Sequence, residues 1–538
     1  MRYLLSFISL FYVLITSAQH IGIKENKGVS IFEKHRENTV FLNSKSKEID
    51  SIVTHFYTSE KYSIFSPKDS ADLLHYAKLL RYSFQSFTDF NLKHLIAIDA
   101  GLSGNKPIQG SDINYLHHAF QVYKKYETTY ERLLDKLEAL QKESSHTVLK
   151  HLMLNIELDQ FHFFYSNYYN AIRNKRLRRI LNASDASFEI KDNDLRKIVK
   201  ELLSKKNYNR IKTGILSNTA TKASLEQIDS ALYNQIHHTS YKKSRIRKDK
   251  RKMRRFFRQD NSYKFKQFLT HYISAVIGNA AGAVRLRKGF LYKNDSIRNL
   301  IQDKLRPMDI LAEKTGFALT DKMIPGNFGH IALWLGTETQ LKEAGLWDDP
   351  VIFPFQNRIR KGYCILESAR DGTHLKRMKK FINVDELAIA RIKDYAGLSN
   401  SEKIELYKNA LSQLGKDYDF NFDVETSDKL VCSELLYQVF GSIYWPTDKF
   451  LKRSTISPDN VMSLSLYQNN PIELIYYIEG LTKTKFCEKS RDDLAQDLGF
   501  EKRNNVYVLP DERCETIAVK NGTTEKCVKV YHELLYKE

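Results

Sequence analysis

Cys432 has the sequence context of a nucleophile. It opens the run CSELLYQVF, whose apolar pattern predicts a helix that begins at the cysteine. The positive end of a helix dipole and its unpaired N–H groups favour a thiolate over a thiol. The backbone N–H groups of Cys432 and Ser433 could also face the oxyanion that forms during acyl transfer. This placement predicts a cysteine that attacks a carbonyl group.

A nucleophile of this kind needs a base from elsewhere in the fold. His330 begins the run HIALWLG, which predicts a strand, and a strand edge gives a histidine a fixed orientation. The next predicted strand, YCILESA, contains Glu367, which could accept a hydrogen bond from the imidazole and hold its tautomer. Asp371 and His374 lie close by and stay open as alternatives for this third position. Cys364 is expected to pack in the core.

The order of these segments resembles that of the circularly permuted NlpC-type cysteine hydrolases of the papain-like superfamily, the YiiX/YebB-like group. The matching pieces, in chain order, are PMDILAEKTG, GHIALWLG, ILESARDG, GKDYDFNF, LVCSELLYQ and ISPDNV. In this permuted branch the histidine strand precedes the cysteine helix, as it does here. The resemblance implies Cys432 as nucleophile, His330 as base and Glu367 as the orienting residue. It also implies that Tyr418 lines the site beside the nucleophile, so that Tyr418 and Ser433 are the expected substrate or oxyanion contacts.

The resemblance further implies hydrolysis of an amide or acyl bond through an acyl-enzyme, without a cofactor. Cell-wall peptides are the expected substrate. Lipid acyl hydrolysis or transfer is the alternative within enzymes, and a non-catalytic envelope binding module is the alternative outside them. Two positions depart from the family pattern: Asp417 stands where relatives often have Pro, and Met308 where Gly is common.

No metal is expected. Asp159 and His162 have the i, i+3 spacing of a carboxylate–histidine pair, but no second motif of this kind accompanies them. We therefore expect an ordinary surface pair.

The elements that must position the site form an α+β domain. From Arg306 onward, short apolar runs separated by turns predict strands, and they are followed by a helix over 401–415 and the helix at Cys432. The permuted papain-like domain is expected over 301–480. Residues 481–538 form a small β-rich extension, in which Asn521-Gly522 between alternating runs predicts a hairpin.

The extension also contains three of the five cysteines. Cys514 and Cys527 flank the predicted turn at nearly opposed positions, so they are the first choice for a disulfide, with Cys487 left over.

Residues 19–300 predict a mostly α-helical domain. A Ser-Asp cap at Ser111 opens a heptad seam of apolar residues that continues to Leu140, and the stretch from Val148 to Leu181 reads as the returning helix. Helical pattern then continues from Leu195 to Tyr233.

The charge distribution predicts an anionic partner. The chain has a net charge of +20, and segment 241–260 is rich in Lys and Arg. An anionic membrane or cell-wall surface is expected to contact residues 241–284, although the apolar part, 268–284, is too short to span a bilayer. A plain solvated helix is the alternative. No nucleic-acid motif is present, so nucleic acid is not an expected partner.

The first residues predict export. Residues 1–18 combine a short positive start, an apolar run and small residues before a cut at Gln19, which is the pattern of a signal peptide. No cysteine stands near that cut, so a lipid-anchored lipoprotein is not expected. We expect a periplasmic or cell-envelope protein.

Overall fold

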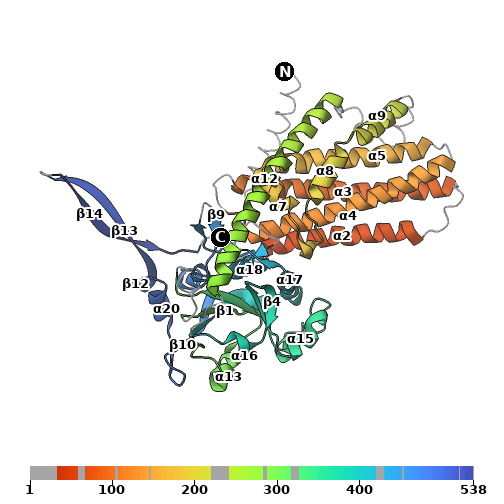
Figure 1. Cartoon of the computed structure of the whole chain (residues 1–538). Coiled ribbons are helices and arrows are strands. Elements are labelled where there is room, and N and C mark those ends of the chain that lie inside the picture. Colours follow the sequence, from red (N-terminus) through yellow and green to blue (C-terminus); the bar gives the residue numbers. More distant parts are fainter. Residues whose placement is uncertain are drawn as a thin grey trace.

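The computed structural model describes residues 33–58, 67–102, 107–143, 147–219, 242–282, 287–316, 326–419, 429–450, 453–519 and 522–536. The predicted signal peptide lies outside these segments. Long helices from the first half of the chain stack side by side, and an α+β domain from the second half lies against one end of the stack (Figure 1). The predicted fold class is confirmed.

Helix α4 (Gly110–Glu143) is the centre of the helical domain. The three- and four-residue spacing of its apolar residues puts them on one stripe of the helix. The stripe is buried at Leu116, Ala119, Tyr123, Tyr126, Tyr130, Leu133 and Leu137. It faces α2 (Glu33–Thr58), α3 (Pro67–Gly101) and α5 (Thr147–Phe163). The predicted heptad seam is therefore confirmed over this stretch.

The predicted returning helix is not continuous. It consists of α5, a π-helical turn (Phe164–Tyr168), α6 (Tyr169–Arg173) and α7 (Lys175–Asn182). The break falls at Asn174, which has an extended backbone (ψ 120°) and accepts a hydrogen bond from the N–H of Arg176. An asparagine that caps the next turn competes with a continuing helix. The prediction of one helix to Leu181 was wrong for this reason.

The later helical pattern divides into separate helices. These are α8 (Asp194–Leu202), α9 (Lys205–Thr219) and the long α12 (Lys243–Gly282), while residues 220–241 lie outside the described segments. None of the helices in the described part of the chain combines the length and the apolar character needed to cross a bilayer.

The α+β domain is built on an antiparallel sheet in the order β11-β10-β5-β1-β2-β3-β4. The predicted strands are confirmed as β1 (Ile310–Lys314), β2 (His330–Trp334), β3 (Ile365–Ala369) and β5 (Glu386–Ile392). The remaining strands are β4 (Gly372–Lys376), β10 (Ile472–Gly480) and β11 (Phe486–Glu488). β11 comes from beyond residue 480, so the extension contributes an edge strand to this sheet.

Helices and short strands surround the sheet. Helix α18 (Cys432–Val439) packs on β2 and β3, with α17 (Asn400–Leu411) beside it. The other α-helices of the domain are α13 (Asp295–Lys304), α14 (Glu338–Glu343), α15 (Gln356–Arg360), α16 (Met378–Phe381) and α19 (Pro458–Ser463). Two short strand pairs complete it: β6 (Asp417–Tyr418) with β7 (Lys429–Leu430), and β8 (Asp448–Phe450) with β9 (Arg453–Thr455).

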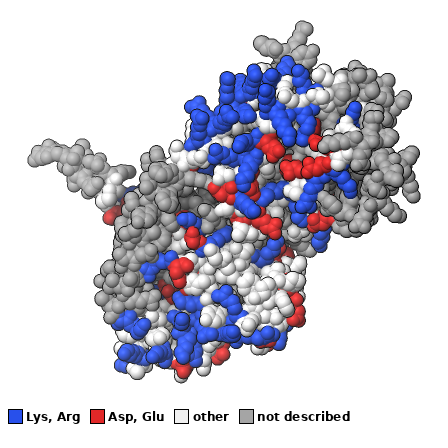
Figure 2. All heavy atoms as spheres, turned by 45° about the vertical axis from the view of Figure 1, so that its right-hand side comes forward, with Lys and Arg blue, Asp and Glu red and all other residues white. Residues whose placement is uncertain are grey.

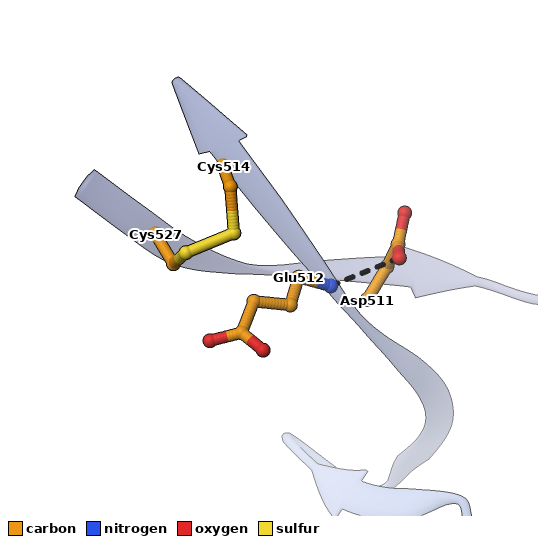
Figure 3. The surroundings of a disulfide bond; sticks show 4 residues. All are labelled: Asp511, Glu512, Cys514 and Cys527. Carbon is orange, nitrogen blue, oxygen red and sulfur yellow. Dashed lines mark hydrogen bonds between the residues drawn. A yellow bond between two sulfur atoms is a disulfide. The ribbon is translucent and has the colours of Figure 1, made fainter. Parts of the chain in front are cut away.

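The C-terminal extension contains α20 (Arg491–Asp497) and a sheet of β12 (Glu501–Arg503), β13 (Val506–Val519) and β14 (Gly522–Glu533). β13 and β14 form the predicted hairpin, which projects away from the body of the molecule (Figure 1). Cys514 and Cys527 lie opposite each other in its register and are joined by a disulfide (Figure 3). The predicted pairing is confirmed, and Cys487 is a free, exposed thiol.

The helical domain touches the back of α18. The N–H of Ser111 donates to the carbonyl of Gly441 (3.0 Å), and the Asn114 amide donates to the carbonyl of Gln438 (3.0 Å). The approach depends on glycine, because a Cβ on Gly441 would lie 2.4 Å from the Ser111 nitrogen. The start of α4 therefore fixes the far end of the helix that carries Cys432.

Candidate active site

The strand register brings His330 and Glu367 together. Side chains alternate between the faces of a strand, so His330 and Ala332 share one face of β2. Ala332 pairs with Glu367 on β3, which places the glutamate diagonally across from the histidine. His330 Nε2 lies 3.1 Å from Glu367 Oε2. Since Nε2 faces the carboxylate, Nδ1 is the ring nitrogen that is left for Cys432.

The carboxylate of Glu367 is fully buried between cations. Its Oε1 lies 3.0 Å from His374 Nε2 and 2.7 Å from Lys376 Nζ, both on β4. Burial alone would raise the pKa of Glu367, but His330 and His374, with the charge of Lys376, hold that pKa well below its usual range. Glu367 is therefore an ionised acceptor for the imidazole. His374, an alternative for the third position, instead contacts the other oxygen of Glu367.

Lys376 was missed in the sequence. Its position had one signal: in the run THLK, His374 and Lys376 are two residues apart and so must share a strand face. Asp371, the other alternative, is exposed and lies 3.7 Å from His374 Nδ1 rather than at His330.

Cys432 is the first residue of α18 and is buried. Burial would lower the pKa of His330, but hydrogen bonds to Cys432 and Glu367, with the charges of Cys432 and Glu313, raise that pKa well above its ordinary value. The arrangement therefore favours an imidazolium that faces the sulfur on one side and a carboxylate on the other.

The first turn of α18 is anchored from within the fold. The N–H of Val431 donates to the Glu434 carboxylate (2.8 Å), and the Ser433 hydroxyl donates to the carbonyl of Ile456 (2.5 Å). The Ser433 side chain thus holds the helix to the segment before α19. Any contact of Ser433 with an oxyanion must come from its backbone N–H.

Tyr418 lies beside the nucleophile. Its strand β6 runs parallel to β7, with Tyr418 opposite Leu430, two residues before Cys432. Burial raises the pKa of the Tyr418 hydroxyl, and the nearby charges of Cys432, Glu434 and Asp419 raise it further. The phenol therefore keeps its proton and can act as a hydrogen-bond donor at the site.

A family model described as "Permuted papain-like amidase enzyme, YaeF/YiiX, C92 family" matches residues 304–492. This segment is a permuted papain-like amidase domain. The resemblance inferred from the ordered motifs is confirmed over this segment, and the match supports a cysteine hydrolase that acts on amide bonds. No curated protein and no solved structure significantly matches the chain. The helical domain lies outside the match.

The backbone conformation at Met308 bears on one of the two departures from the family pattern. Met308 has a positive φ of 67° and is buried, and its N–H donates to the carbonyl of Trp334 (2.7 Å). A left-handed backbone favours glycine, which accounts for the residue common in relatives. Met308 supplies apolar packing at the end of β2 at the cost of this strained conformation. Asp417 is exposed, at the start of β6.

Asp459 is a second residue that sequence reasoning missed. It stands in the motif ISPDNV, in the first turn of α19, and accepts from the backbone N–H groups of Asn327 (2.7 Å) and Phe328 (2.8 Å). These contacts fix the approach to β2. Asp459 thus positions the strand that carries His330.

The expected surface pair of Asp159 and His162 is only half correct, because His162 is exposed but Asp159 is not. Asp159 is buried and lies 3.4 Å from Arg81. Within the described segments, no group of three or more His, Cys, Asp or Glu residues could hold a metal ion.

Proposed function

We propose that the chain is an exported cysteine amidase that uses Cys432, His330 and Glu367 as a catalytic triad. The observation that supports this most strongly is the position of His330, which bonds Cys432 on one side and the ionised Glu367 on the other. A base held in this way by a carboxylate is the arrangement that activates a nucleophile in acyl transfer.

In the first half-reaction the Cys432 sulfur attacks the carbonyl carbon, and the carbonyl oxygen becomes an oxyanion. The backbone N–H groups at the start of α18 and the Tyr418 hydroxyl supply hydrogen bonds to that oxygen. His330 then donates its Nδ1 proton to the leaving amine, the C–N bond breaks, and a thioester forms on Cys432.

In the second half-reaction His330 is neutral and takes a proton from water. The resulting hydroxide attacks the thioester carbonyl, the C–S bond breaks, and the acid product leaves. Cys432 returns as a thiolate beside a protonated His330. Glu367 holds the ring and stabilises its cationic form throughout, without being protonated itself.

The substrate we propose is a peptide of the cell wall. The support is the amidase chemistry of the family together with the signal-peptide pattern of residues 1–18. The alternative is a lipid acyl bond, which the same triad could cleave. A non-catalytic binding module is the remaining alternative, and the presence of an intact nucleophile, base and carboxylate speaks against it.

The experiment that separates these functions is covalent trapping. The purified protein is mixed separately with cell-wall peptide fragments and with phospholipid vesicles, quenched rapidly in acid, and digested for mass spectrometry. A peptide acyl adduct on Cys432 supports the proposal, and its absence from Cys432→Ala is the control. A fatty-acyl adduct would transfer the proposal to lipid, and no adduct with either would favour a binding module.

Export has its own test. The protein is expressed in a bacterium, and the envelope and cytoplasmic fractions are separated. We expect the envelope form to begin at Gln19, which N-terminal sequencing reads directly. Protein that begins at Met1 and stays in the cytoplasm would contradict export, and with it the cell-wall substrate.

A further inference from the structure

Helix α12 is held to the helical domain by one narrow stripe. Its buried positions are spaced three or four residues apart, which puts them on one side of the helix; they are Ile246, Asp249, Met253, Phe257 and Asp260. Lys250, Lys252 and Phe256 are half-buried at the sides of this stripe, and the other residues from 242 to 262 are exposed. The helix is therefore anchored along one side only.

Both acidic residues of segment 241–260 belong to this inner stripe. Asp249 accepts hydrogen bonds from the hydroxyls of Tyr165 (2.8 Å) and Tyr169 (2.7 Å). Asp260 pairs with the buried guanidinium of Arg178. The two carboxylates are thus engaged on the inner side of the helix, and of the exposed basic residues of this segment only Arg245 lies near one of them, 3.9 Å from Asp249.

The outer face is mostly basic and has no acidic residue among its exposed positions from 242 to 260. We call it the basic ridge, and it consists of eight exposed residues: Lys242, Lys243, Arg247, Lys248, Arg251, Arg254, Arg255 and Arg258. None of the eight forms an ion pair within the described part of the chain. Figure 2 shows Lys and Arg side chains crowded over the upper part of the molecule, on the helical domain.

Such a face is unfavourable in water without an anionic partner. Pairs such as Arg247 and Arg251, or Arg251 and Arg255, stand four residues apart, where like charges on a helix repel. Solvated helices usually intersperse acidic residues with basic ones, which relieves this repulsion. Here the acids are turned inward instead. The ridge is therefore complementary to a dense array of negative charge.

We propose that the basic ridge docks the protein on a bilayer that contains anionic phospholipid. The sequence of α12 selects lipid over other polyanions, because the same helix continues into FLTHYISAVIGNAAG and ends at Gly282. A bilayer interface accommodates both a basic face and an adjoining apolar segment, whereas a nucleic acid or an anionic cell-wall polymer has no place for the apolar part. This docking goes beyond the proposed amidase function and does not depend on it.

The test is co-sedimentation of the purified protein with vesicles across a salt series. We expect binding to phosphatidylcholine vesicles that contain phosphatidylglycerol, little binding to pure phosphatidylcholine, and a steep loss with salt, because exposed charges are screened over about 8 Å at physiological ionic strength. Each basic group near an anionic bilayer strengthens binding about fivefold. The triple variant Arg251→Gln, Arg254→Gln, Arg255→Gln should therefore bind roughly a hundredfold more weakly.

A matched control removes the same charge elsewhere. Lys361→Gln, Lys483→Gln and Lys485→Gln change exposed lysines of the α+β half of the chain, and this triple variant should bind almost as well as the wild type. Replacing the three ridge arginines by lysine keeps the charge and should preserve binding even if the Gln variant folds poorly. A thermal melt checks each variant.

Several outcomes would overturn the proposal. These are equal losses in the ridge and control variants, equal binding to neutral and anionic vesicles, or no vesicle binding by the wild type at low salt. Binding to isolated cell wall but not to vesicles would also overturn it, since the anionic partner would then be the wall polymer.

Discussion

Two buried glutamates, one in each half of the molecule, differ in the charge of their neighbours. Glu367 in the papain-like domain lies among His330, His374 and Lys376, and its pKa is held well below the usual range. Glu127 in the helical domain is also buried, but its Oε2 accepts from the neutral Gln160 amide (2.7 Å). Burial raises its pKa to about 7, against the smaller opposing effect of its hydrogen bonds.

The comparison shows what decides the charge of a buried carboxylate in the active site and in the helical domain. Burial penalises the charge of both carboxylates, so the charge state is decided by the cations that surround each one. The papain-like domain supplies three of them and keeps a permanent negative charge beside the base. In the described part of the helical domain no cation pairs with Glu127, so this carboxyl keeps its proton below about pH 7. Each half should therefore respond differently to mutation and to pH.

The largest expected effect is at the residue that links the Glu367 cluster to the nucleophile. His330→Ala removes proton transfer from both half-reactions, so we expect kcat/KM to fall by about 10⁴-fold or more. The measurement is steady-state hydrolysis of a peptide amide, with circular dichroism to confirm folding. A loss of less than about tenfold would mean that His330 is not the base.

The same substitution in the two halves should have opposite signs. Glu367→Gln leaves buried cations without their counter-charge, so we expect a loss of about 3 kcal/mol in the free energy of unfolding, together with partial loss of activity. Glu127→Gln removes a group that is costly to ionise, so at pH 8 it should stabilise the protein by about 1–3 kcal/mol. Denaturant unfolding at pH 8 measures both. The same sign for both variants would break the comparison.

The pH dependence of stability distinguishes Glu127 from Glu367 further. The pKa of Glu127 is raised in the folded state. Its contribution to the free energy of unfolding is therefore full below about pH 4.5 and is lost as pH rises through about 7. The pKa of Glu367 is lowered, so its contribution is full above the unfolded pKa and is lost as pH falls. Between pH 5 and 6.5 only the first contribution changes, by about 2 kcal/mol.

The two halves can be followed separately, because all three tryptophans lie in the papain-like domain. Far-ultraviolet circular dichroism follows the helical domain, and tryptophan fluorescence follows the other. From pH 5 to 6.5 the helical transition should weaken, and it should weaken less in Glu127→Gln. Identical slopes in the wild type and in this variant would show that Glu127 is not buried as a protonated acid.

The smallest expected effect concerns the contact between the halves. In Gly441→Ala the new methyl group would meet the Ser111 backbone, and we expect a cost of about 1–3 kcal/mol. Because Gly441 lies just beyond the end of α18, kcat should fall slightly while the pH profile of activity stays unchanged. A shifted pH profile would instead mean that the helical domain tunes the ionisation of the site.

The order of motifs and the strand pattern were enough to predict the α+β class, most central strands and the helix at Cys432. The alternation of side chains within a strand is a local property. The strand in the run HIALWLG can therefore be predicted from the sequence alone. The hairpin disulfide could be predicted for the same reason, because Cys514 and Cys527 flank one turn at matching distances.

Contacts that depend on register or on the facing of a helix were not predicted. Lys376 reaches Glu367 only because β4 folds back on β3, and the charge pattern of β4 does not reveal that partner. Asp459 is separated from Asn327 by more than a hundred residues, so no local pattern connects them. The break at Asn174 was missed because the apolar pattern continues across it.

The central claim, that His330 holds Cys432 as the reactive thiolate, is tested most directly by alkylation at pH 6. The three free cysteines are labelled with iodoacetamide, and each rate is read by peptide mass spectrometry. Cys364 is the inert reference, because burial raises the pKa of its thiol to about 12, and Cys487 is the exposed one. We predict that Cys432, although buried, reacts at least about tenfold faster than Cys487, and that His330→Ala removes this advantage. Equal rates for Cys432 and Cys487 in the wild type, or an unchanged Cys432 rate in His330→Ala, would contradict the account.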